Sequence, residues 1–242
     1  MRILVISDIH ANFTALEAVI AANAMVDAVW CLGDLVGYGP DPNECVERVQ
    51  SLPNLTCLLG NHDAAVTGAM DLAKFNHEAA ASILWTRAAL TPSNLAFLRS
   101  LAEKQTNSLF TLVHASPQNP VWEYVLDSYT AMLNFACFDS QIALVGHTHL
   151  PLAFSEQGVS KQVKRDLLKA GEQIKLNTRK ILNPGSVGQP RDHDPRASFA
   201  ILDPEHMTWR IRRVEYNIRP VQDRILAAGL PEKHAQRLAE GW

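Results

Sequence analysis

The chain has 242 residues, 47% of them hydrophobic and 19% charged, which is typical of a globular protein and lacks the signature of disorder. Its formal net charge of −3 gives no basic excess with which to bind nucleic acid stably. No apolar run reaches the length of a membrane span, and the apolar part of MRILVISDIH is too short for a signal peptide. The four cysteines show no C-x-x-C spacing. We therefore expect a cytoplasmic protein with free thiols and no membrane partner.

Short apolar runs that repeat along the chain predict buried β-strands. They span 2–7, 27–33, 55–60, 109–113 and 141–146. Continuous apolar runs of this kind indicate strands that are covered on both faces. Each run is followed directly by residue types that bind metal ions. Because ligands gather beyond the carboxyl ends of strands in layered α/β folds, we expect these side chains to form one site.

Helical segments alternate with these strands in the first part of the chain. Helices are predicted over 12–24, 75–89, 92–101 and 124–137. The later part favours β-hairpins over 150–160, 172–185 and 197–216, followed by a helical tail from Pro220 that is interrupted at 229–231. This order predicts two sheets packed face to face with helices outside, in a single domain over 1–242.

The side chains at the strand ends include seven candidate metal ligands: Asp8, His10, Asp34, Asn61, His114, His147 and His149. Seven ligands are too many for one tetrahedral zinc ion and enough for two ions that share a carboxylate. Imidazole, carboxylate and amide groups without thiolate fit Mn²⁺, Fe or Zn²⁺. Asp34 follows a glycine, where the backbone permits close approach, so we expect this carboxylate to bridge the ions.

The spacing of the candidate ligands predicts which side chains face one another, and the set of ligands suggests phosphoryl chemistry at two metal ions. His147 and His149 are two residues apart, so in an extended backbone their rings would face one place, and the same holds for Asp8 and His10. Two ions about 3.5–4 Å apart clamp a phosphoryl group for in-line displacement by a deprotonated water. His62 is expected beside the ions as the general acid that protonates the leaving oxygen.

Five further residues are candidates for catalysis or substrate binding. Asp63 is predicted to orient His62 or to hold its proton. Arg191 could clamp phosphate or pair with neighbouring aspartates on the surface. Asn183 begins a turn whose N–H groups could face phosphate, or it only shapes that turn.

Asn12 and Tyr38 complete this group of candidates. Asn12 is a candidate for substrate contact, although a helix N-cap is the reading we favour. Tyr38 could stack on a base or serve only in packing. His77, His193, His206 and His234 fall outside the motifs and are expected on the surface or on helices. The basic stretch 161–180 favours a solvated hairpin or helix face over the steering of anions.

The order of these motifs resembles the calcineurin-like metallophosphoesterases. The residues that carry the resemblance are ISDIH (6–10), GD (33–34), GNHD (60–63), His114 and GHTH (146–149), across nearly the whole chain. The loops GYGPDP (37–42) and NPGSVGQPRD (183–192) resemble the small bacterial phosphodiesterase-like branch. The resemblance implies a four-layer αββα sandwich of two mixed β-sheets flanked by helices, with a dinuclear centre at one edge.

The resemblance also implies a division of the ligands. One ion would be held by Asp8, His10, Asp34 and His149, and the other by Asp34, Asn61, His114 and His147. We therefore expect a metal-dependent phosphoesterase that cleaves a phosphodiester or nucleotide-type phosphate of a small substrate. Hydroxide held by two divalent ions would attack phosphorus; Mn²⁺ is expected first, with Fe, Zn²⁺, Ni²⁺ or Co²⁺ as alternatives.

The chain departs from the family pattern at one position, and this departure bears on the alternative functions. Protein phosphatases and diadenosine tetraphosphatases of the family carry an arginine soon after the G-D motif, where GDLVGYGP has Tyr38. This counts against a protein phosphatase and leaves a phosphomonoesterase or a diadenosine polyphosphate hydrolase as alternatives. A metal-binding protein-interaction scaffold, the role of a retromer subunit that resembles the family, is disfavoured because all seven ligands and His62 are retained. A nuclease is disfavoured by the acidic pI.

Overall fold

The structure of the protein is a computed structural model that describes residues 1–158 and 162–242. The strands are β1 (Ile3–Ile6), β2 (Ala28–Cys31), β3 (Thr56–Cys57), β4 (Lys104–Thr106), β5 (Phe110–Val113), β6 (Ile142–Leu144), β7 (Leu152–Gln157), β8 (Gln162–Leu167), β9 (Gln173–Lys175), β10 (Lys180–Leu182), β11 (Ala197–Asp203) and β12 (Thr208–Val214). The helices are α1 (Phe13–Ala21), α2 (Pro42–Gln50), α3 (Asn61–Thr67), α4 (His77–Ala89), α5 (Pro92–Ser100), α6 (Ser128–Asn134), α7 (Ile218–Ala227) and α8 (Glu232–Glu240). Short 3-10 turns span Leu72–Lys74 and Phe135–Cys137.

The strands form two mixed sheets that pack face to face. The first sheet has the order β3-β2-β1-β11-β12-β9, and the second has the order β4-β5-β6-β10-β7-β8. Side chains alternate across β1: Ile3 and Val5 enter the core between the sheets, whereas Leu4 and Ile6 pack against helices on the outside. With α6 covering the outer face of the second sheet, the four-layer αββα sandwich expected from the sequence is confirmed.

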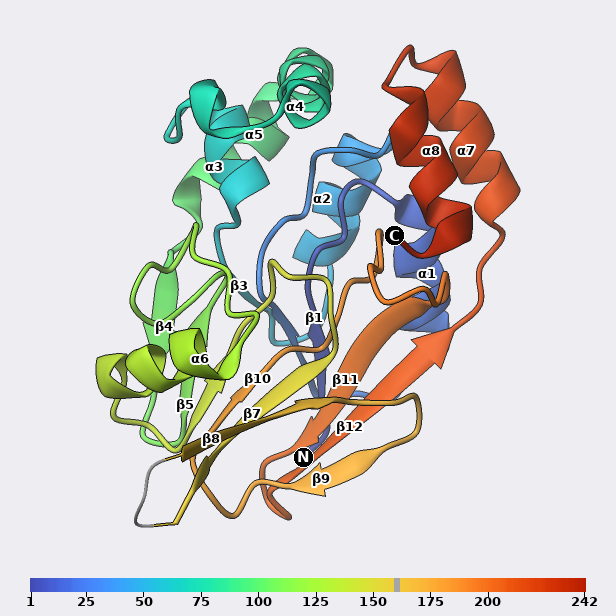
Figure 1. Ribbon diagram of the computed structural model, residues 1–242. Coiled ribbons are helices and arrows are strands. Elements are labelled where there is room, and N and C mark those ends of the chain that lie inside the picture. The colour runs from blue at the N-terminus through green and yellow to red at the C-terminus, as the bar shows by residue number, and fades with distance from the viewer. Residues whose placement is uncertain (159–161) are drawn as a thin grey trace.

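Parallel pairing places the predicted ligand-bearing strand ends along one edge. β1, β2 and β3 run parallel to one another in the first sheet, and β5, β6 and β10 do so in the second. Figure 1 shows α3, α4 and α5 on one side and α7 and α8 on the other, at the top of the view beyond these strands. The helices therefore flank the edge at which the candidate side chains gather.

All four predicted helices are present, and polar side chains begin them. Asn12, Asn76, Thr91 and Asp127 accept hydrogen bonds from main-chain N–H groups in the first turns of α1, α4, α5 and α6. The helical tail and its interruption are also confirmed as α7 and α8. In contrast, α2 and α3 were not predicted from the sequence; α2 begins at Pro42, where the loop motif ends, and α3 begins within the GNHD motif.

One of the three predicted hairpins is found within its bounds, since β11 pairs with β12. The run predicted over 150–160 contains β7 alone, because its partner β8 begins at Gln162, beyond the predicted end; residues 159–160 lie outside the described residues. The hairpin predicted over 172–185 is wrong, because its strands lie in different sheets: β9 pairs with β12, whereas β10 lies between β6 and β7. Buried Leu176 joins the core between the sheets at this crossing.

The basic stretch lies at the edge of the second sheet and in the segment that follows it. Most of β8 is exposed at the edge of the second sheet, as a solvated face requires, whereas Lys180 at the end of the stretch is buried at the start of β10; residue 161 lies outside the described part. Within the two described ranges, no helix has the length and apolar character that crossing a membrane requires.

Candidate functional site

Five of the candidate ligands lie in a strained backbone conformation. Asp8, His10, Asp34, His147 and His149 have φ angles of 54°, 48°, 54°, 64° and 61°. The extended backbone expected for each pair is therefore wrong, because these loops turn through the left-handed region directly after the strands. Each such residue costs of order 1–3 kcal/mol, and such strain is concentrated at functional sites. Asp8 and His10 still face one place, as expected, whereas His147 and His149 do not.

The structure brings all seven candidate ligands together in the interior, each at most 3% exposed. Asp8, His10 and His149 form one cluster whose possible ligand atoms lie within 4.8 Å of one another, and Asp34, His114 and His147 form a second. Asn61 joins the second cluster, since its Oδ1 lies 3.0 Å from Nε2 of His114. His147 and His149, although neighbours in sequence, thus belong to different clusters.

Asp34 lies between the two clusters. Its Oδ2 is 3.5 Å from Nε2 of His10 and 3.4 Å from Nε2 of His114, and it is buried without a hydrogen-bond partner. Its Oδ1 accepts the main-chain N–H of His62 at 2.9 Å, which fixes the carboxylate. A buried carboxylate oxygen without a partner is costly unless a cation binds it. This is the position that a bridging ligand would occupy.

Main-chain carbonyl oxygens orient three of the imidazole rings. Nδ1 of His10 lies 3.2 Å from the carbonyl oxygen of Val36. Nδ1 of His114 lies 2.9 Å from that of Leu32, and Nδ1 of His149 lies 2.5 Å from that of Gln189. Because a carbonyl only accepts, each Nδ1 carries the hydrogen and each Nε2 keeps its lone pair for a metal ion. The Nε2 atoms of His10 and His149 lie 3.1 Å apart. Two lone pairs at this distance repel one another and are both attracted by a cation, so the residues fit divalent metal ions.

His147 is held in place by different contacts. Its main-chain N–H donates to both carboxylate oxygens of Asp8 at 3.1 Å, and its Nε2 lies 3.2 Å from the carbonyl oxygen of Trp122. Its ring stacks on Tyr124 with 3.8 Å between the ring centroids. With Nε2 directed at a carbonyl, Nδ1 is the nitrogen that remains for an ion.

Two glycines allow the Asp34 loop to approach the start of α3. Gly33 has a φ of 103°, and a Cβ atom built on it would lie 2.7 Å from the main-chain nitrogen of Gly60. A Cβ atom on Gly60 would in turn overlap the carboxylate of Asp34. Close approach of the two backbones therefore requires glycine at both positions.

Asp63 joins the same two segments and does not orient His62 as predicted. Its Oδ1 accepts the N–H groups of Leu35 and Val36 at 3.0 and 3.2 Å, and its Oδ2 accepts that of Gly60 at 3.0 Å. Both oxygens are thus used by main-chain donors, two from the Asp34 loop and one from the N-cap of α3. The role predicted for Asp63 is corrected to that of a positioning residue for the Asp34 loop.

This correction leads to a prediction about stability. Asp63→Asn replaces one acceptor oxygen by an NH₂ group that cannot accept a main-chain N–H. The free energy of unfolding is expected to fall by about 1–3 kcal/mol, the cost of leaving a buried main-chain N–H without its acceptor. Urea denaturation followed by circular dichroism measures it, with exposed Asp71→Asn as the control. An unchanged midpoint would show that these contacts do not hold the loop.

Burial and mutual charge shift the pKa values of the clustered groups. Burial lowers the pKa values of His10, His147 and His149 well below the ordinary value, which keeps them neutral and able to bind a metal ion. Burial alone would also lower the pKa of His114, but Asp34 outweighs it and the pKa rises to about 9. Burial opposes ionisation of Asp34, yet His114 and His62 hold its pKa well below the usual range. A cation would therefore replace a proton on His114.

His62 lies beside the clusters in the first turn of α3. Its ring packs against Tyr38, His10 and Phe75, with 4.4, 4.9 and 5.2 Å between ring centroids. Burial lowers the pKa of His62 to about 4. One of its nitrogens also lies within 4.8 Å of ligand atoms of Asp34 and His10, so the ring borders both clusters.

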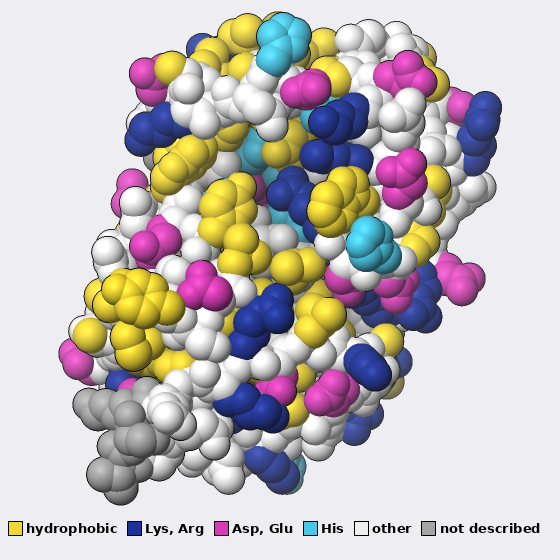
Figure 2. Space-filling model, in the orientation of Figure 1, with side chains coloured by type: hydrophobic (Ala, Val, Ile, Leu, Met, Phe, Trp, Pro, Cys, Tyr) yellow, Lys and Arg dark blue, Asp and Glu magenta, His cyan; other side chains and the backbone are white. Residues whose placement is uncertain are grey.

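Arg191 faces the site and not the neighbouring aspartates. Asp192 pairs with Arg213, and Asp194 pairs with Arg196 at 2.7 Å, so the surface alternative considered for Arg191 is wrong. The guanidinium carbon of Arg191 lies 5.9 Å from the centroid of the Tyr38 ring. In Figure 2 a hollow in the visible face contains histidine side chains, with Lys and Arg side chains at its mouth.

Asn12 and Asn183 have protein partners for their amide groups. Asn12 accepts the N–H of Ala15 as the N-cap of α1, and its amide donates to Gly188 and Tyr216. Asn183 accepts the N–H of Gly185 and donates to Gly146 and Thr148. These contacts support the capping and turn alternatives, so we do not keep either residue among the substrate contacts.

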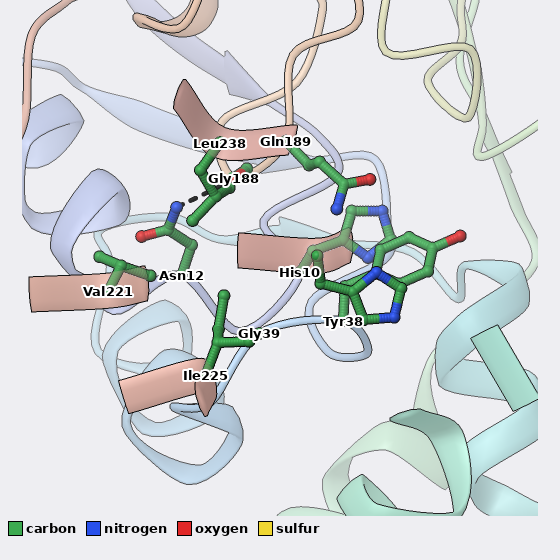
Figure 3. Close-up of a pocket in the computed structure, with 10 residues that line it drawn as sticks. His10, Asn12, Tyr38, Gly39, Gly188, Gln189, Val221, Ile225 and Leu238 are labelled. Atoms are coloured by element: carbon green, nitrogen blue, oxygen red, sulfur yellow. Dashed lines mark hydrogen bonds between the residues drawn. The ribbon is translucent and has the colours of Figure 1, made fainter. Parts of the chain in front are cut away.

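Helix α8 adds side chains that the sequence analysis did not connect with the site. His234 is 2% exposed, and its ring lies 4.7 Å from that of Tyr38, centroid to centroid. A small pocket lies between α7, α8 and the clusters; Figure 3 shows Val221, Ile225 and Leu238 on one side of it and His10 and Tyr38 on the other. The helical period of the tail predicted α8 itself but carried no signal of what its buried face contacts.

Comparison with known proteins agrees with this geometry. The sequence profile of the calcineurin-like phosphoesterase superfamily domain matches residues 1–207, and the chain belongs to this family. Over 249 residues, 99% of this chain and 98% of the relative, it is 40% identical to an uncharacterised protein of Methanocaldococcus jannaschii.

Solved structures give the same result. The crystal structure of a metallophosphoesterase from Sphaerobacter thermophilus has a TM-score of 0.92 and 45% identity, covering 100% of this chain and 99% of that one. A hypothetical protein from Pyrococcus horikoshii shares the fold, with a TM-score of 0.83 and 21% identity over 100% of this chain and 98% of that one.

Proposed function

We propose that this protein is a metal-dependent phosphoesterase that hydrolyses a phosphodiester or nucleotide-type phosphate at a centre of two divalent metal ions. The observation that carries the proposal is Oδ2 of Asp34, a buried carboxylate oxygen without a hydrogen-bond partner between the Nε2 atoms of His10 and His114. Membership of the phosphoesterase family supports the reaction class.

The two clusters divide the ligands between the ions. Asp8, His10, Asp34 and His149 would hold one ion, and Asp34, Asn61, His114 and His147 the other. Two such ions supply an activated water and stabilise the charge on the phosphoryl oxygens. The donors are imidazole, carboxylate and amide groups, which suit Mn²⁺, our first choice, and also Fe, Zn²⁺, Ni²⁺ or Co²⁺.

The chain's own residues would complete the reaction. His62 protonates the leaving oxygen, since its ring borders both clusters without being needed to complete either one. A phosphate anion beside this buried ring raises its pKa from about 4, because the anion stabilises the imidazolium form. Arg191 contributes a fixed positive charge near the same place and pairs with phosphoryl oxygens.

Chelation and metal reconstitution test the proposal. Protein treated with a chelator is expected to lose hydrolysis of bis(p-nitrophenyl) phosphate and to regain it when Mn²⁺ is added, with a preference for this diester over p-nitrophenyl phosphate. Tight binding of two ions without turnover of either ester would contradict the enzyme and favour the protein-interaction scaffold. A preference for the monoester would favour the phosphomonoesterase alternative. Diadenosine polyphosphates assayed in parallel test the third alternative.

A further inference from the structure

Helix α8 borders the site and is held at both ends by contacts with distant parts of the chain. Near its start, Nε2 of His234 lies 3.2 Å from the carbonyl oxygen of Glu78 in α4. At its end, the N–H of His193 donates to the carbonyl oxygen of Gly241 at 2.8 Å, which joins α8 to the loop that carries Arg191. The matched family profile ends at residue 207, so this helix lies beyond the matched part.

Arg237 lies on the same face of α8 as His234, because residues three apart are neighbours on a helix. Its Nε is buried without a hydrogen-bond partner, and its guanidinium has no ion-pair partner within the described residues. Arg191 shares part of this condition: its Nε is also buried and unpartnered, while its guanidinium donates to the side-chain oxygen of Gln189 and to the hydroxyl of Tyr38. Two arginines that form no ion pair within the described residues are therefore found next to Tyr38 and His234, which line this pocket.

Tyr38 places these arginines relative to the metal ligands. Its ring contacts His10 at 4.6 Å, His234 at 4.7 Å and the guanidinium of Arg191 at 5.9 Å, measured to ring centroids. The main-chain N–H of Arg191 donates to the carbonyl oxygen of His149 at 3.4 Å, which places Arg191 next to the metal ligands. Burial lowers the pKa of Arg237, and the charge of Arg191 lowers it further. Arg191 thus adjoins both the metal ligands and Tyr38, whose ring contacts His234 of α8. Two partly buried guanidinium groups repel one another unless an anion lies between them.

We infer that Arg237 and Arg191 form a second anion site, which binds a phosphate group adjacent to the one held at the metal centre. The substrate class would then be esters of diphosphate or polyphosphate. Arginine presents a planar fork of donors that matches phosphate oxygens, and both Nε atoms are still free to donate. A single phosphate at the metal centre would meet Arg191 alone, because Arg237 lies on the α8 side of Tyr38.

Calorimetric titration of the Mn²⁺-loaded protein with two phosphonates that cannot be hydrolysed tests this inference, which rests on the proposed function. Methylenediphosphonate has two adjacent anionic groups, and methylphosphonate has one. Arg237→Gln is expected to weaken methylenediphosphonate binding by roughly 10- to 100-fold, the value of a charge-assisted hydrogen bond, and methylphosphonate binding much less. Each titrant is compared between protein variants at one Mn²⁺ concentration, so chelation by the titrant cancels in the ratio.

Lys233→Gln is the matched control, because it removes one positive charge from the same helix at a residue that pairs with Glu78. It is expected to leave both dissociation constants unchanged. Arg237→Lys keeps the charge without the planar fork and is expected to recover part of the loss, which separates recognition from a folding defect.

Each remaining outcome decides against one of the two proposals or both. An unchanged dissociation constant for methylenediphosphonate in Arg237→Gln would overturn the second anion site alone, provided the wild type hydrolyses the chromogenic diester. Equal weakening by Lys233→Gln would also overturn it, since a general field would then explain the binding. A wild type that binds neither phosphonate and cleaves no ester would overturn the proposed function and this inference with it.

Discussion

Replacing Asp34 by Asn is expected to weaken the binding of both metal ions and to abolish turnover. The change is nearly isosteric, and Oδ1 of the new side chain can still accept the N–H of His62. The other oxygen, between His10 and His114, becomes an NH₂ group that cannot bind a cation. Loss of a residue that only supports a ligand costs about 10- to 100-fold in metal affinity, so loss of a shared ligand is expected to exceed about 100-fold for each ion.

The number of ions that Asp34→Asn binds is measured by mass spectrometry of the metal content, after dialysis at a fixed free Mn²⁺ concentration. Asp166→Asn is the matched control, because it makes the same chemical change at the edge strand β8, in a residue that pairs with Lys164. The control is expected to bind two ions. Two ions retained in Asp34→Asn would contradict the bridging role, while loss of only one would assign Asp34 to a single ion.

The sequence was sufficient for those features that depend on local pattern. Strand β1 alternates Ile3 and Val5 with Leu4 and Ile6, and burial on both faces follows from having a sheet on one side and helices on the other. Since a chain leaves a parallel strand at the edge where the site lies, a ligand-type residue after each apolar run was enough to predict that these residues meet. The sequence pattern around each strand end thus predicted which residues gather at the site.

Tertiary contacts decided the rest of the geometry, which the sequence could not provide. Left-handed backbone at His147 and His149 separates two rings that an extended strand would have kept together. The approach of Gly33 to Gly60, held by Asp63, depends on segments 27 residues apart closing on one another. Such conformations are stabilised by contacts from elsewhere in the fold and therefore leave no local periodicity.

The position of Arg237 could not be predicted from the sequence either, because it depends on contacts between residues far apart in the chain. The sequence predicts a helical tail, but a prediction of helix does not say what that helix covers. The helix reaches the site because Gly241 bonds to the loop of His193 and because His234 contacts Glu78, two contacts with distant parts of the chain. Recognition elements supplied by a C-terminal helix therefore become visible only in the folded structure.

His62→Ala is expected to lower turnover by about 10²- to 10⁴-fold, the usual contribution of a general acid, while two metal ions remain bound. The ring borders both clusters, but each has its own ligands without it. The matched control is His77→Ala, which removes an exposed imidazole from α4. Full turnover in His62→Ala would remove this residue from the mechanism, and loss of metal would make it a ligand.

Leaving-group dependence separates proton donation by His62 from a structural role. A series of aryl phosphodiesters with leaving groups of increasing pKa is measured with the wild type and with His62→Ala. A leaving oxygen of low pKa departs as an anion without help, whereas one of high pKa needs a proton as the bond to phosphorus breaks. The deficit of the variant is therefore expected to grow with the pKa of the leaving group. A deficit that stays constant across the series would mean that the ring only packs against Tyr38 and His10, because a displaced metal centre slows every ester alike.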